Sequence, residues 1–192
     1  MKVNAAPRIL IVAGLCAAAL IGLVVSEGFA RQSGEEVLLP MEAVDPRSLL
    51  SGHYVLLNPA QRLEPGQTCP TGGDLEWVAL QQSGDIYVVA GGAESREQAQ
   101  LLGLPVKGHF TCIEPGEALP GVEATPGLVT LSLGIDRFHI NQTEALRIEQ
   151  VLREQNVDAA SRAFAIVSIG RDGRGRLKGL QIDGERLELT WL

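Results

Sequence analysis

Residues 75–92 read LEWVALQQSGDIYVVAGG, two apolar runs that flank the polar turn QSGD. The runs favour β-strands, and the Ser83–Gly84 pair supplies a turn between them. The stretch therefore predicts a β-hairpin. Other short apolar runs lie on both sides of it, and most of the 22 glycines and 10 prolines fall between such runs. The pattern indicates a mainly β chain with about eight strands.

Two segments have helical character instead. Residues 142–155 place apolar side chains on one face at helical spacing, and Asn141 followed by Glu144 resembles a capping box. A shorter helix is expected within 93–103, with Ser95 as its cap. The predicted fold class is mainly β (α+β): a small antiparallel β-barrel or sandwich with one packed helix, preceded by an N-terminal transmembrane helix.

The N-terminal segment contains 17 consecutive uncharged residues, from Ile9 to Val25. As a helix it would span about 25 Å, close to the thickness of a bilayer core. Lys2 and Arg8 precede this run and Glu27 follows it, so the N-terminus is expected in the cytoplasm and the remainder outside. The alternatives are a cleaved signal peptide ending at GFA (28–30) and a buried helix of a soluble protein.

These features predict three parts of the chain. Residues 1–30 form a membrane anchor with its transmembrane helix at about 9–25, residues 31–40 form a linker, and residues 41–192 form an extracytoplasmic β-rich domain. The expected location is the cytoplasmic (inner) membrane, crossed once, with lipid as the partner of the N-terminal helix.

The charge of the chain bears on its partners. Its formal net charge is -7, and beyond residue 25 there are 14 basic residues against 23 acidic ones, a balance of -9. Nucleic acid and anionic lipid both need cations to neutralise phosphate, so an acidic domain is a poor candidate for binding either. We expect no nucleic-acid partner.

Two cysteines lie in the part expected outside the cytoplasm. An even pair in an oxidising compartment predicts a disulfide between Cys69 and Cys112. The alternative is a metal site in which His53 and His109 join the two cysteines, although their spacing follows no zinc pattern. Cys16 lies inside the apolar run and is expected to act as a small hydrophobe.

The sequence shows no complete catalytic set. Residues 38–60 are faintly like the start of a signal-peptidase-like fold, whose chemistry needs a serine activated by a neutral lysine. Ser48 and Ser51 lie in a turn, and Lys107 has no nucleophile in the expected place. Asp183 and Glu185 lie in a turn and are expected to be solvated. We therefore expect no enzyme activity, catalytic residue, cofactor or metal.

Residues 52–59 read GHYVLLNP, and here the chain resembles the GDYXXLXY proteins, a family of bacterial membrane-anchored proteins. Gly52, Tyr54 and Leu57 match the motif, whereas His53 and Pro59 stand where the family has Asp and Tyr. Residues 133–152 and 165–187 are similar to the family's strand-to-helix segment and closing strands. The resemblance implies an anchored envelope protein with no assigned activity, associated with polytopic membrane proteins, and it supplies no catalytic residues.

Three functions follow from these observations. The leading hypothesis is a non-enzymatic, single-pass accessory or interaction domain for membrane partner proteins. The second is a module that binds a small molecule or peptide in the mouth of a barrel. The third is a signal-peptidase-like serine hydrolase, which would need Ser or Cys within hydrogen-bond reach of Lys107 or a histidine.

Overall fold

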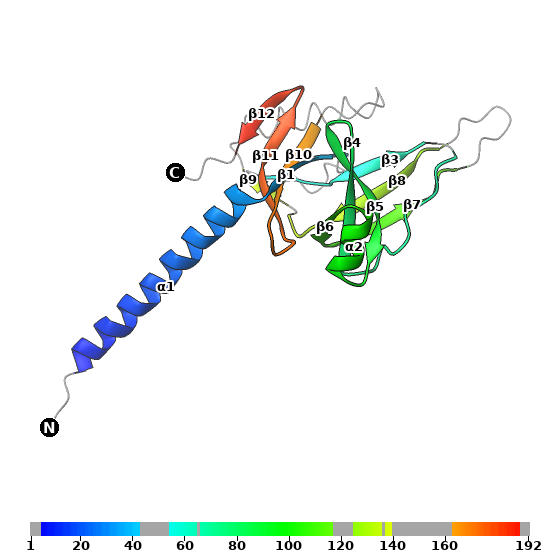
Figure 1. Ribbon diagram of the computed structural model, residues 1–192. Helices are drawn as coiled ribbons and strands as arrows, with labels where there is room; N and C mark the ends of the chain where they lie inside the picture. Colours follow the sequence, from blue (N-terminus) through cyan, green and yellow to red (C-terminus); the bar gives the residue numbers. More distant parts are fainter. Residues whose placement is uncertain are drawn as a thin grey trace.

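The computed structural model describes residues 5–42, 54–64, 66–116, 125–135, 137–139 and 163–188. Helix α1 (Ala5–Ser33) leaves the β-rich part of the chain as one straight rod (Figure 1). Between Ile9 and Val25 its large apolar side chains are 49% to 72% exposed, so the domain covers none of this stretch. The helix is long and apolar enough to cross a membrane.

The first sheet joins both ends of the chain. It has the order β1-β10-β11-β12, and all neighbours are antiparallel. Its strands are β1 (Glu35–Pro40), β10 (Ala163–Ile169), β11 (Gly175–Ile182) and β12 (Glu185–Glu188). β10 is buried along almost its whole length, which makes it the centre of the core on this side.

The second sheet contains the predicted hairpin. β4 (Trp77–Ser83) pairs with β5 (Ile86–Ala93) around Gly84, whose φ of 64° suits the turn, and with β6 (Leu104–Lys107) on its other edge. Helix α2 (Arg96–Leu102) packs on this sheet. Its cap is as predicted, because Ser95 Oγ accepts a hydrogen bond from Gln98 N at 3.3 Å.

Two further sheets complete the described part. β3 (Ala60–Leu63), β8 (Gly127–Ser132) and β7 (His109–Ile113) form one in the order β3-β8-β7. β2 (Tyr54–Leu56) and β9 (Arg137–His139) form the other. One apolar cluster draws buried side chains from all the larger sheets.

The mainly β class is confirmed. The strands that the structure describes form separate antiparallel sheets and no closed barrel. The helix predicted at 142–155 lies outside the described residues, so the packed helix that the structure does describe is α2.

The predicted linker is wrong. Within 31–40, α1 continues to Ser33, and β1 begins at Glu35. Val37 and Leu39 are buried in the main core. Polar residues precede Val37, so the local pattern does not indicate a strand. The strand forms because β1 pairs with β10, which lies near the other end of the chain.

Gly34 is the single residue between α1 and β1. A Cβ atom at this position would lie 2.7 Å from the carbonyl oxygen of Ile169 and closer still to the Ser168 hydroxyl. The backbone of the helix exit therefore lies directly against β10, and only glycine allows this approach.

A disulfide fastens the loop before β4 to β7. The structure joins Cys69 and Cys112, whose Cα atoms lie 5.9 Å apart, in the range that disulfides require. The backbone N–H of Cys69 also donates to the Glu114 carboxylate at 3.3 Å. The bridge closes 43 residues of chain around the hairpin and α2.

Gly34→Ala should destabilise the domain by about 1–3 kcal/mol, because the added methyl group meets backbone that cannot move independently. Gly28→Ala is the matched control, since nothing lies within 4 Å of its Cβ position and alanine favours a helix. Urea denaturation of the full-length protein in detergent checks both. Equal midpoints for the two variants would contradict the close approach at Gly34.

Replacing Cys69 and Cys112 with serine should lower the free energy of unfolding by about 3–4 kcal/mol, since the open chain gains the entropy of the released loop. Cys16→Ser is the control, because Cys16 is an exposed free thiol on α1. The same denaturation assay, with and without a reducing agent, measures the loss. A double variant as stable as wild type would show that the bridge constrains nothing.

Candidate functional site

The motif residues lie where the chain enters its sheets. Gly52 is outside the described residues, and Tyr54 begins β2, where its backbone is paired with His139. Leu57 is only 7% exposed and belongs to the main core. At Leu57, therefore, the motif contributes to packing.

The last two motif positions, Asn58 and Pro59, form backbone hydrogen bonds with two other segments. Glu42 N donates to the carbonyl oxygen of Asn58 at 3.1 Å, and Met41 and Pro59 form an isolated antiparallel bridge. From the other side, Leu131 N donates to the carbonyl oxygen of Pro59 at 2.8 Å. The extension of β1 and strand β8 thus hold the residues between β2 and β3.

A partly buried ion pair lies beside the Met41–Pro59 bridge. Glu42 is 8% exposed, and Arg62 on β3 donates to its two carboxylate oxygens at 2.6 and 2.9 Å. The hydrogen bond to Glu42 raises the pKa of Arg62 above its ordinary value. The sequence offered no signal for this pair, since one Glu and one Arg 20 residues apart form no recognisable spacing.

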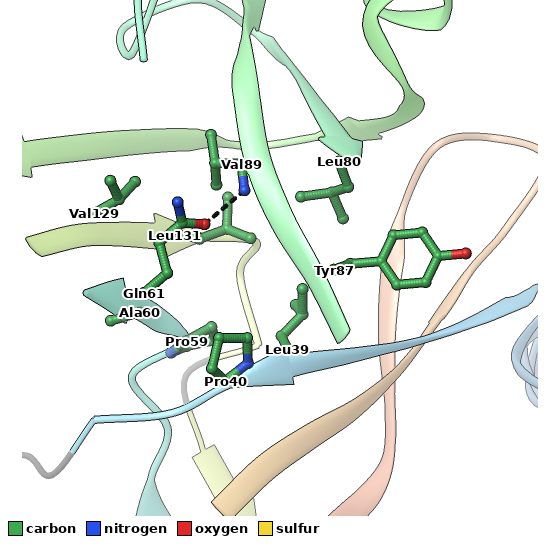
Figure 2. A pocket seen from close by; sticks show the side chains of 10 residues that line it. All are labelled: Leu39, Pro40, Pro59, Ala60, Gln61, Leu80, Tyr87, Val89, Val129 and Leu131. Carbon is green, nitrogen blue, oxygen red and sulfur yellow. Dashed lines mark hydrogen bonds between the residues drawn. The ribbon is translucent and has the colours of Figure 1, made fainter. Parts of the chain in front are cut away.

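A small apolar cavity lies between β1, β3, β5 and β8 (Figure 2). Gln61 spans part of it, and its Oε1 accepts a hydrogen bond from Val89 N at 2.7 Å. The cavity volume is about 10 Å³, room for a single water molecule at most. It is lined by Leu39, Pro40, Pro59, Ala60, Gln61, Leu80, Tyr87, Val89, Val129 and Leu131.

Tyr87 is the one ionisable residue on the wall of this cavity. Figure 2 shows its hydroxyl pointing away from the other lining side chains, and it donates to Glu35 at 3.2 Å. Burial and, secondly, the Glu35 carboxylate raise the pKa of Tyr87 above its ordinary value. The phenol stays protonated and serves to attach β5 to the start of β1.

The lysine considered as a catalytic base has other partners. Lys107 Nζ lies 3.3 Å from a Glu76 carboxylate oxygen and 5.2 Å from the centre of the Trp77 ring. Ser48, Ser51 and His53 lie outside the described residues.

The proposed metal ligands are not available together. Cys69 and Cys112 are joined in the disulfide, and His109 is exposed on β7. Within the described ranges no group of three or more His, Cys, Asp or Glu side chains could hold a metal ion. Asp183 and Glu185 lie at the β11–β12 turn, where Asp183 has a positive φ of 51°.

A charged cluster lies where α1 meets the β10–β11 hairpin. The Arg176 guanidinium donates to both Glu27 of α1 and Asp172 of the hairpin turn, the latter at 2.9 Å. Arg31 donates to the carbonyl oxygen of Leu177. The Arg176 hydrogen bond, above all, lowers the pKa of Asp172 from 3.8 to about 2. We define Glu27, Arg31, Asp172 and Arg176 as the helix–domain junction.

A second group of charges continues the junction along the sheet. Glu36 on β1 accepts from Lys178 at 2.8 Å and from Arg186 at 2.7 Å. These contacts, led by the Lys178 hydrogen bond, lower the pKa of Glu36. The sequence analysis missed both groups. The signal available was the concentration of arginine in residues 170–176 (GRDGRGR) of an otherwise acidic domain.

Arg62→Met should cost about 2–3 kcal/mol of folding free energy, because it leaves the Glu42 carboxylate buried without its partner. Glu42→Gln with Arg62→Met should recover most of this loss, since no buried charge remains. Urea denaturation of the wild type, both single variants and the double variant completes a double-mutant cycle. Additive losses would show that the two side chains are not coupled.

The GDYXXLXY protein family model matches residues 16–180. This match covers most of the chain, from inside the apolar part of α1 to β11. No curated protein and no solved structure gives a significant match. The motif positions, the disulfide, the small cavity and the charged junction thus describe a β-rich domain behind an apolar helix, and the chain belongs to the GDYXXLXY family.

Proposed function

We propose that this protein is a single-pass, membrane-anchored envelope protein whose domain is a non-enzymatic accessory or interaction module for a polytopic membrane protein. The observation that carries the proposal is α1. Its apolar side chains are exposed throughout the span, and its last turns are bonded to the domain. A surface this apolar needs cover from lipid or from another membrane protein.

The flanking charges support one orientation. Lys2 and Arg8 precede the apolar run and Glu27 follows it, which favours a cytoplasmic N-terminus and an extracytoplasmic domain in the inner membrane. The Cys69–Cys112 disulfide agrees with an oxidising compartment. The contacts of Glu27 and Arg31 with β11 also argue against cleavage after GFA (28–30), since cleavage would remove Glu27 and expose its partner.

The described part of the domain favours interaction over chemistry. The apolar cavity beside Gln61 has room for one water molecule, so this cavity gives no support to the alternative of a small-molecule or peptide site. The side-chain contacts of Lys107 in the described part of the chain are with Glu76 and Trp77 and not with a serine or cysteine, so they give the hydrolase alternative no support. Because the domain is bonded to α1, a partner that binds α1 inside the membrane would also set the position of the domain on the extracytoplasmic side.

A photoreactive amino acid placed at Leu15 or Leu20 should crosslink α1 to one polytopic membrane protein in intact cells. Both side chains are exposed on the apolar span and no part of the domain covers them. The control position is Asp85 in the β4–β5 turn, which is exposed but belongs to the domain. Mass spectrometry of the crosslinked products identifies the partner.

A variant with a replaced apolar segment distinguishes membrane anchoring from contact with the partner. Residues 9–25 are replaced by an unrelated apolar sequence, and residues 26–33 are kept so that the helix–domain junction stays intact. Carbonate-resistant membrane association should persist, and the crosslink should disappear. If the wild-type protein crosslinked only to lipid, the proposal of a protein partner would be refuted. If the purified protein turned over a substrate and a point variant abolished that turnover, the non-enzymatic assignment would be refuted.

A further inference from the structure

We propose that the β10–β11 hairpin turn, residues 170–175, is a lipid-contact surface that binds anionic phospholipid headgroups of the bilayer in which α1 is anchored. The inference rests on the proposed anchoring by α1. It goes further by assigning a second membrane contact to the domain itself and a headgroup chemistry to that contact.

The first argument is the height of the hairpin above the bilayer core. Arg176 is bonded to Glu27, which lies two residues beyond the last apolar residue, Val25. Two helical residues rise about 3 Å. The headgroup layer on each side of the hydrocarbon is about 5–7 Å thick. With the hydrocarbon boundary taken at Val25, we expect Arg176 and the turn that leads into it at the level of the phosphates.

The second argument is that the turn is held firmly at this height. Gly170 N and Arg174 O close it with a hydrogen bond of 3.0 Å. The backbone N–H of Lys107 donates to the carbonyl oxygen of Gly173 at 2.7 Å. The Cα of Gly173 faces the Trp77 ring so closely that a Cβ would lie 2.5 Å from a ring carbon. The second sheet thus supports the turn from behind.

The third argument is local charge. Arg171 and Arg174 are exposed, and neither forms an ion pair with any residue that the structure describes. Arg176 offsets Asp172 and Glu27, and Arg96 of α2 donates to the carbonyl oxygen of Arg171 at 2.6 Å. Within residues 170–176 there are three arginines, which face Asp172 and the bonded Glu27, a balance of +1 at the turn itself. At the start of α2, Arg96 is offset by Glu94 and Glu97.

The fourth argument is the neighbouring apolar surface. α2 lies near the β10–β11 turn, because Arg96 of α2 donates to the carbonyl oxygen of Arg171, and Figure 1 shows both on the lower side of the domain. α2 ends in Leu101 and Leu102, which are 88% and 51% exposed. Arg96 and these two leucines share one short helix, and arginine together with exposed leucine suits the boundary between headgroups and acyl chains. Charge complementarity therefore favours anionic lipid as the occupant.

Hydrogen exchange of the full-length protein in nanodiscs tests this surface. One set of nanodiscs contains neutral phosphatidylcholine and the other a mixture with anionic phosphatidylglycerol. Peptides covering residues 170–176 should exchange about fivefold more slowly in the anionic discs, the effect of roughly one arginine held at the surface. The β11–β12 turn is the internal control, because it lies at the far end of β11, about 23 Å away.

The variant Arg171→Gln/Arg174→Gln should lose this lipid-dependent protection, and Arg186→Gln, a control on β12 that also removes an arginine charge, should keep it. Equal exchange in the two kinds of disc, or protection that survives in the double variant, would refute the proposed lipid contact. The arginines would then be assigned to an acidic protein partner. Co-purification with the discs is scored separately. A chain that does not enter them would overturn the anchoring and the surface together.

Discussion

The pairing of β1 with β10, which begins one residue beyond α1, is the constraint on which the rest of this structure depends. Glu35 is paired with Ile169 and Pro40 with Phe164, so the helix enters a sheet without an intervening linker. Gly34 makes this possible because any larger residue would meet the backbone of β10. A helix that continues directly into a core strand cannot turn freely against its domain, and the domain therefore shares the orientation of the helix.

Electrostatic contacts reinforce this geometry close to the surface of the proposed membrane. Arg176 ties α1 to the hairpin, and Glu36 ties β1 to β11 and β12. Asp172 has a folded-state pKa of about 2, below its ordinary value of 3.8, so its contribution to stability is fully present above about pH 4 and is lost as the pH falls toward 2. The lowered pKa of Glu36 acts in the same direction, and both groups are in their stabilising, ionised form at neutral pH. Half-exposed pairs of this kind stabilise weakly one by one, so their role is to fix orientation.

Local patterns predicted the elements that depend on local interactions. The hairpin at 75–92 and the Ser95 cap are encoded within a few residues of themselves, and both are confirmed. β1 was missed because the side chains that bury Val37 and Leu39 come from the opposite end of the chain. The Glu42–Arg62 pair could not be predicted for the same reason, since nothing in the spacing of two single charges indicates that they are buried together. Leu57 was identified as a motif residue, and its burial gives that position a packing role which the motif alone did not reveal.

Net charge illustrates the limit of composition as a guide to partners. The balance of -9 beyond residue 25 argued against binding of anionic lipid. That conclusion assumes that the charge is spread evenly over the domain. The fold is not uniform in this respect: residues 170–176 carry three arginines and one aspartate, and Arg176 contacts α1, whereas Asp85 and Asp183 lie in the turns of other hairpins. Screening limits the reach of a charge to about 8–10 Å, so a surface responds to the charges within that distance and not to the total. In the proposed arrangement, a domain fixed to its helix presents one edge to the bilayer, so the charges on that edge matter more than the total charge.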